Sequence, residues 1–141
     1  MTRLFKTQKC TLLFSLKGRY NKMFILIDGE PIPAARPRFG GGHAYQPKRN
    51  SEYRARVQRA ARAAMGGSAP MTGAIEANVK LFRRYKPTAR NFGDVDNYLK
   101  AIFDGLNQIV FDDDRQIVQC VVEKFQDKAN PRAEITISER F

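Results

Sequence analysis

Carboxylate side chains gather in one short part of this chain. Six of its fourteen acidic residues lie within 21 positions, among them Asp94, Asp96 and the triplet Asp112–Asp114. Because side chains alternate along extended backbone, Asp94 and Asp96 are expected to point to the same side. Clustered carboxylates repel one another unless a cation neutralises them, and Mg²⁺ prefers hard oxygen ligands. A divalent-metal site is therefore one interpretation of the cluster.

Lys100 follows Asp96 by four residues, which places the two side chains on one face of a helix. Such a lysine can stabilise a charged phosphate or polarise an attacking water, while a bound metal activates that water. Each feature also has a purely structural interpretation. Asp96 can serve as a helix N-cap, Asp112–Asp114 as a solvated turn, and Asp96 with Lys100 as a surface ion pair. On the residues alone these alternatives stay open.

The overall charge of the chain indicates what kind of molecule it binds. The chain of 141 residues carries a formal charge of +11, with an isoelectric point near 10.1, which indicates a polyanionic ligand. Residues 1–22 hold six basic residues and no acid, and we expect a flexible basic arm or an upstream-start extension before a single domain at 23–141. No stretch approaches the roughly 20 apolar residues of a membrane span. Cys10 and Cys120 are expected to be reduced cytosolic thiols, Cys120 inside a strand.

Hydrophobic periodicity predicts two main helices and four strands. The first helix is expected from Asn50 or Ser51 to Met65, and the second from Asp96 to Ile109 or Val110. The strands are expected at 24–27, 75–82, 117–125 and 133–138, the last two as an antiparallel hairpin, with a structureless loop at 30–49 and a basic loop at 83–90. The approximate order βαβαββ predicts an α+β domain with a mixed sheet packed against the helices.

Two blocks of sequence carry a resemblance to a known family. Residues 93–106 contain Asp94, Asp96, Asn97 and Lys100, and residues 111–117 contain a pair of aspartates, then Arg115, Gln116 and Ile117. Together they closely resemble the RusA family of Holliday junction resolvases, whose pattern is D-x-D-N-x-x-K-x-x-x-D-x-L followed by D-D-x-Q-[VI]. Residues 31–39 also look like the N-terminal loop of many phage and Gram-positive members. The resemblance covers about 23–138 and is dense over 31–39 and 93–117.

The resemblance implies a role for particular residues. The metal ligands of the family fall on Asp94, Asp96 and Asp114, and its essential lysine falls on Lys100. Asp113, the neighbour of Asp114, is a candidate additional acid, whereas Asp112 lies outside the family pattern. Gly93 occupies the position at which some family members carry an arginine. A DNA contact that such an arginine makes would have to be made in this chain by other basic residues. The basic residues expected to bind DNA are Arg36, Arg38, Lys48, Arg49, Arg84, Lys86 and Arg90.

The same resemblance implies an activity. It predicts a RusA-like homodimer that resolves four-way DNA junctions by paired nicks, with Mg²⁺ as cofactor and Mn²⁺ as a substitute. A cytoplasmic protein of bacterial or phage origin, associated with the nucleoid, is implied with it. Two other hypotheses remain: a nuclease that acts chiefly on flaps or other branched DNA, and a catalytically silent protein that binds junctions by shape.

Overall fold

The computed structural model describes residues 20–35 and 38–140, and four long strands form its main sheet. These strands are β1 (Tyr20–Asp28), β4 (Ala74–Arg83), β5 (Ile117–Gln126) and β6 (Arg132–Arg140). Their order across the sheet is β1-β6-β4-β5, with β4 and β5 parallel and the other pairs antiparallel. The α+β class with a mixed sheet, predicted from periodicity, is therefore confirmed.

The pairing of the last two strands differs from the prediction. β5 and β6 do not form a hairpin, because β4 lies between them and pairs with both. A helical crossover leads from β4 to β5 and makes those two strands parallel neighbours, as βαβ units do. β6 then occupies the remaining place between β4 and β1, where its alternating Ala133, Ile135 and Ile137 are completely buried.

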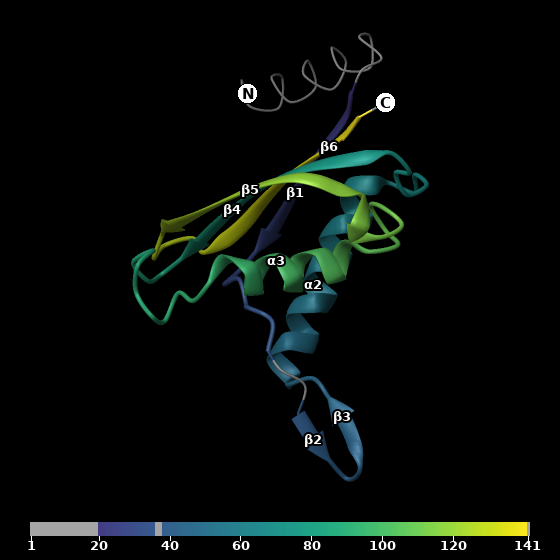
Figure 1. The fold of residues 1–141 in the computed structure, drawn as a ribbon. Helices are drawn as coiled ribbons and strands as arrows, with labels where there is room; N and C mark the ends of the chain where they lie inside the picture. The colour runs from purple at the N-terminus through teal and green to yellow at the C-terminus, as the bar shows by residue number, and fades with distance from the viewer. Residues whose placement is uncertain (1–19, 36–37, 141) are drawn as a thin grey trace.

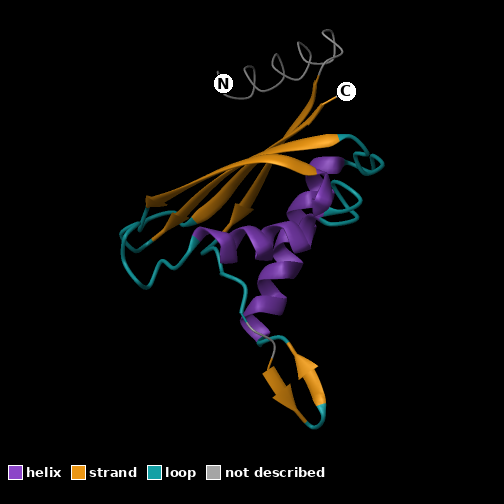
Figure 2. Cartoon of the chain, in the orientation of Figure 1, coloured by secondary structure: helices purple, strands orange, loops and turns teal. Residues whose placement is uncertain are grey.

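Two helices cover one face of this sheet, as Figures 1 and 2 show. Helix α2 (Lys48–Met65) begins two residues earlier than expected, after Pro47, and ends at Gly66 in the left-handed conformation. Helix α3 (Val95–Leu106) ends three or four residues earlier than expected. The apolar stripe continues into Ile109 and Val110, but the helix does not, since Gln108 has φ +66°. Apolar periodicity thus extended past the end of the hydrogen-bonded helix.

The segment expected to be structureless contains a small hairpin. Strands β2 (Arg38–Gly40) and β3 (His43–Tyr45) pair antiparallel around Gly41 and Gly42. Both glycines have positive φ, +59° and +80°, as a tight two-residue turn requires. The hairpin extends away from the sheet beyond the start of α2 (Figure 1), and β3 is exposed throughout.

The core lies between the sheet and the helices. Alternate residues of β1, β4 and β6 face inward, as the period of two requires. β1 begins at Tyr20, so residues 20–22 belong to a strand and not to the expected arm, and residues 1–19 with Cys10 lie outside the described residues. Gly105 of α3 lies against Val57 of α2, where an added Cβ would come within 2.6 Å of Val57 Cγ1. The fully buried residues of the helices include Tyr53, Val57, Ala61, Tyr98, Ile102 and Leu106.

Candidate active site

Asp94 and Asp96 lie together at the N-terminal end of α3. Asp94 is the N-cap residue, in extended conformation, and Asp96 lies in the first helical turn. The side chain of Asp94 makes no capping hydrogen bond, and both residues are exposed. The first turn of a helix favours negative charge, because its backbone N–H groups are unpaired. Asp96 is therefore not the N-cap, and both carboxylates face solvent.

Gly93 explains a departure from the family pattern. Its φ is +88°, in the left-handed region that glycine adopts at little cost. This conformation turns the chain between the fully buried Phe92 and the exposed Asp94. An arginine at position 93 would be strained in this conformation.

Lys100 follows on the exposed side of α3. No ion pair between Lys100 and Asp96 is found among the residues that the structure describes, so the interpretation of the two as a surface pair is not supported. Lys100 and Asp104 line a hollow of about 250 Å³ between α3, α2 and residues 32–35. The lysine ammonium is thus placed one helical turn beyond Asp96, on an open surface.

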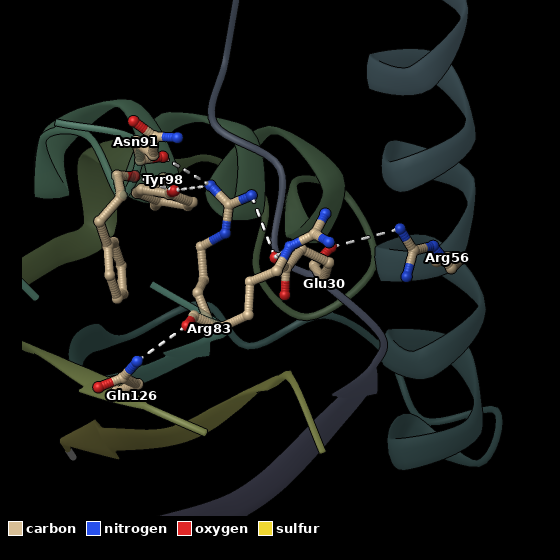
Figure 3. A network of polar contacts seen from close by, with 8 residues as sticks. Glu30, Arg56, Arg83, Asn91, Tyr98 and Gln126 are labelled. Carbon is tan, nitrogen blue, oxygen red and sulfur yellow. Dashed lines mark hydrogen bonds and ion pairs between the residues drawn. The ribbon is translucent and has the colours of Figure 1, made fainter. Parts of the chain in front are cut away.

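A buried polar network holds the N-terminal end of α3, and the sequence analysis missed it (Figure 3). Arg83 was expected in a basic loop, but it is the last residue of β4 and only 5% exposed. Its guanidinium donates to the hydroxyl of Tyr98 on α3 and, at 3.3 Å, to the carboxylate of Glu30. The Tyr98 hydroxyl in turn donates to the carbonyl of Phe92, just before Asp94. Ile75, Ala77, Val79 and Leu81 face inward, and Arg83 is the next residue in this alternation. The alternation is therefore a sequence signal from which the burial of Arg83 could have been predicted.

Further contacts tie this network to the rest of the fold. Arg56 of α2 donates to the carbonyl of Asp28 at 2.9 Å and approaches the carbonyl of Glu30 at 3.5 Å. Arg84 also pairs with Glu30, at 3.3 Å, but its side chain is 64% exposed. Burial raises the pKa of Tyr98, against the opposing effect of Arg83. The start of α3 is therefore fixed by β4, α2 and the segment after β1.

Asp113 and Asp114 lie at the entry to β5. Asp113 precedes the short 3₁₀ turn η1 (Asp114–Gln116). The side chain of Gln116 accepts hydrogen bonds from the N–H groups of Asp112 and Asp113, at 2.8 and 3.0 Å. It donates to the carbonyls of Met71 and Gly73, at 2.9 and 3.0 Å. The acidic triplet is thus an ordered structure that one glutamine fastens to the segment before β4.

The two carboxyls of this turn affect each other. A hydrogen bond with Asp114, together with the Arg115 guanidinium at 2.5 Å, lowers the pKa of Asp113. The same contact with Asp113 raises the pKa of Asp114, and burial and the charges of Asp113 and Asp104 add to the increase. Asp114 begins η1 eight residues after α3 ends at Leu106, so it follows the C-terminal end of that helix.

One chain does not bring all three predicted ligands together. In a parallel βαβ unit the helix runs opposite to the strands, so its start and the start of the next strand lie at opposite edges. The 12 residues of α3 span about 18 Å, and Figure 1 shows the loops before and after α3 at opposite ends of the sheet. Among the described residues no group of three acidic, histidine or cysteine side chains is placed to hold a metal ion. Asp94 and Asp96 both lie at the start of α3, whereas Asp114 lies beyond the opposite end of this helix.

The basic residues expected to contact DNA fall in two places. Arg84, Lys86 and Arg90 are exposed in the loop that leads from β4 to α3, next to Asp94. Lys48 and Arg49 are exposed at the start of α2. Arg36 lies outside the described residues, and for Arg38 the structure describes the backbone alone.

Comparison with known proteins assigns the chain to a class. Residues 28–138 match the family described as endodeoxyribonuclease RusA, and the chain belongs to this family. RusA nucleases resolve Holliday junctions and are generally dependent on divalent metals. The chain is also similar to the uncharacterized protein YqaN of Bacillus subtilis (strain 168), with 29% identity over 134 residues that cover 80% of this chain and 93% of the relative. In the described part of the chain no helix is long and apolar enough to cross a membrane.

Proposed function

We propose that this protein is a Mg²⁺-dependent endonuclease that resolves Holliday junctions by paired nicks and works as a homodimer. One observation carries the proposal: two exposed carboxylates, Asp94 and Asp96, are held by a buried network at a helix N-terminus beside a basic loop. Carboxylate oxygens are the ligands that Mg²⁺ prefers. The basic loop supplies the positive charge that a DNA backbone requires. Mn²⁺ is the expected substitute.

Each residue has a separate task in this proposal. Asp94 and Asp96 of one subunit, together with Asp114 of the partner subunit, would hold the metal, since Asp114 lies apart from the other two within one chain. The bound metal would supply an activated water and positive charge near the leaving oxygen. Lys100 approaches the scissile phosphate from the next turn of α3 and stabilises the extra negative charge of the transition state. Arg84, Lys86 and Arg90 hold the flanking phosphates and so position the strand over Asp94 and Asp96. Asp113 acts on Asp114 through their shared hydrogen bond.

Cleavage of a synthetic four-way junction tests the proposal. We expect nicking in Mg²⁺ by the wild-type protein, and a loss of more than about 100-fold in Asp96→Asn, because even an outer hydrogen-bond partner of a metal ligand contributes about 10–100-fold. Asp112→Asn is the matched control, since Asp112 is exposed and lies outside the family pattern. Equal cleavage by wild type and Asp96→Asn in Mg²⁺ would refute the site.

The same assay separates the other two hypotheses. A catalytically silent junction-binding protein would bind the four-way substrate without nicking it in Mg²⁺ or Mn²⁺. A nuclease specialised for other branched DNA would cut a matched flap faster than the junction. The proposal expects the junction to be the better substrate, since two sites related by a two-fold axis match the symmetry of a four-way junction.

A further inference from the structure

A hollow of about 250 Å³ lies beside Lys100, between α2, α3 and residues 32–35. The two helices cross in contact with each other (Figure 1). Four alanines belong to the lining of the hollow, among them Ala55 on α2 and Ala101 on α3. Pockets for drug-sized ligands measure roughly 300–1,000 Å³. This hollow therefore admits one small ring system and excludes a DNA duplex.

The polar side chains around this hollow are not paired with one another. Arg54 and Gln58 of α2 line it, as do Lys100 and Asp104 of α3. Within residues 20–35 and 38–140, none of these four side chains forms a hydrogen bond or an ion pair. Gln58 and Asp104 are half-buried. A guanidinium, an ammonium, an amide and a carboxylate are therefore available to a ligand that enters the hollow.

Two buried polar atoms in this region have no partner among the described residues. Tyr53 belongs to the lining of the hollow and is 1% exposed, and its hydroxyl is one of the two atoms. An adjoining hollow of about 430 Å³ shares Arg54, Gln58 and Asp104 with the first. It is also lined by Asn107, whose buried Oδ1 is the second atom. Because buried polar groups are nearly always hydrogen-bonded, this groove has hydrogen-bonding capacity that a ligand can use.

This combination of groups matches the chemistry of a nucleotide. A base is a flat ring with hydrogen-bond donors and acceptors on its edge, and amide and carboxylate side chains such as Gln58 and Asp104 pair with such edges. Small apolar walls with a few polar groups suit the ring itself. A phosphate alone fits less well, because the carboxylate of Asp104 would repel it. Arg54 and Lys100 supply the positive charge that the phosphate of the same nucleotide requires.

We propose that this hollow binds one unpaired base of the branched DNA, from a nucleotide next to the scissile phosphate. The inference rests on the proposed function for the path of the strand, which brings the scissile phosphate to Lys100. Lys100 lines the hollow, so a base that leaves the stack beside this phosphate is within reach of it. Extruding a base costs least where pairing is already disrupted, as at a branch point. The hollow therefore favours a branched strand over an intact duplex.

Single nucleotides test the base site without any cleavage. Each of the four deoxynucleoside monophosphates is titrated into the isotope-labelled full chain, and the backbone amide shifts are followed by NMR. Deoxyribose phosphate is the matched probe that lacks a base. We expect at least one nucleotide to give saturating shifts at Gln58 and Lys100 that deoxyribose phosphate does not give.

Filling the hollow should abolish these shifts. Ala101→Leu and Ala55→Leu add bulk to its lining from α3 and from α2, so one variant still tests the site if the other does not fold. Ala63→Leu is the control, because Ala63 is exposed on α2 and lies outside the lining, and it should keep the shifts. Shifts that are absent for all four nucleotides, equal for deoxyribose phosphate, or retained in the filled variants overturn the inference.

A four-way junction that carries the fluorescent base 2-aminopurine distinguishes the inference from the function on which it rests. The fluorescent base replaces each base next to the mapped nick in turn, and the protein is added without divalent metal. We expect the fluorescence to rise at one of these positions when the wild type binds, because the base leaves the stack, and to rise less with Ala101→Leu.

The outcomes of this experiment separate the two proposals. An active wild type that leaves the fluorescence unchanged at every position, or an equal rise with Ala101→Leu, overturns the base site and leaves the nuclease proposal standing. A wild type that does not nick the junction in Mg²⁺ refutes the nuclease proposal instead, and base binding in the hollow is then decided by the nucleotide titration alone.

Discussion

The two acidic ends of the β4–α3–β5 unit are built in different ways. The end that carries Asp94 and Asp96 is fixed by Arg83, which reaches Glu30 and Tyr98 from a distant strand. The end that carries Asp113 and Asp114 is fixed by one neutral side chain, Gln116. One end therefore depends on buried charge brought together by the whole fold. The other depends on uncharged hydrogen bonds, two of them within the same turn.

This difference predicts unequal sensitivity to mutation, and Arg83 should show the largest effect. Arg83→Met keeps the apolar stem but leaves the Glu30 carboxylate, which is 19% exposed, without its buried partner. Breaking a buried pair on one side costs about 3–5 kcal/mol, and we expect the low end of that range because Arg84 still approaches Glu30. Urea unfolding measures the loss. Junction cleavage should fall with it under conditions where the variant is folded, because the start of α3 loses its connection to β4.

Arg84→Met is the matched control for this prediction. Arg84 pairs with the same Glu30 oxygen at the same 3.3 Å, but its side chain is 64% exposed. An exposed ion pair contributes less than about 1 kcal/mol. If the two variants lost equal stability, the buried network would not be what holds this end of the helix.

Gln116 should show an intermediate effect. Gln116→Ala removes two accepted and two donated hydrogen bonds and leaves the carbonyls of Met71 and Gly73 without this donor. Unsatisfied polar groups that stay partly buried cost about 1–3 kcal/mol, so we expect a loss in that range in urea unfolding. Gln116→Glu keeps an acceptor and loses both donated bonds, and it should be at least as unstable. A Gln116→Ala variant as stable as wild type would show that the acidic turn does not depend on this side chain.

The smallest effect is expected for a single exposed cation of the loop before α3. Lys86→Met should weaken junction binding to a similar degree for every sequence and reduce the slope of log affinity against log salt by about 0.9, the value for one lost phosphate contact. A titration of fluorescent junction across salt concentrations measures this slope. Lys80→Met is the control, because Lys80 is exposed on β4, where its outward position lies on the sheet face opposite the helices. Equal slopes for Lys86→Met and wild type would show that Lys86 makes no phosphate contact and would contradict the proposed role of this loop in DNA binding.

Local patterns in the sequence were enough to predict the positions of several strands and the family of this protein. The alternation of apolar residues located β4, β5 and β6 to within a few residues. The blocks at 93–106 and 111–117 resemble the RusA family, and the match over residues 28–138 bears this resemblance out. Such periodicities are visible in sequence because each reflects contacts between a few neighbouring residues and one apolar surface. Two consecutive glycines, Gly41 and Gly42, are also a local sequence signal for a tight turn, although the hairpin that they connect was not predicted.

Tertiary structure alone decided which segments became neighbours. β4 lies between β5 and β6 in the sheet. The crossover through α3 places β5 on one side of β4, so β6 pairs with β4 on the other side. Arg83 is buried because Glu30, 53 residues earlier, and Tyr98, 15 residues later, converge on it. Asp94 and Asp114 lie at opposite ends of α3 for the same topological reason. Neighbour relations of this kind depend on long-range packing and on chain direction, which no local period encodes.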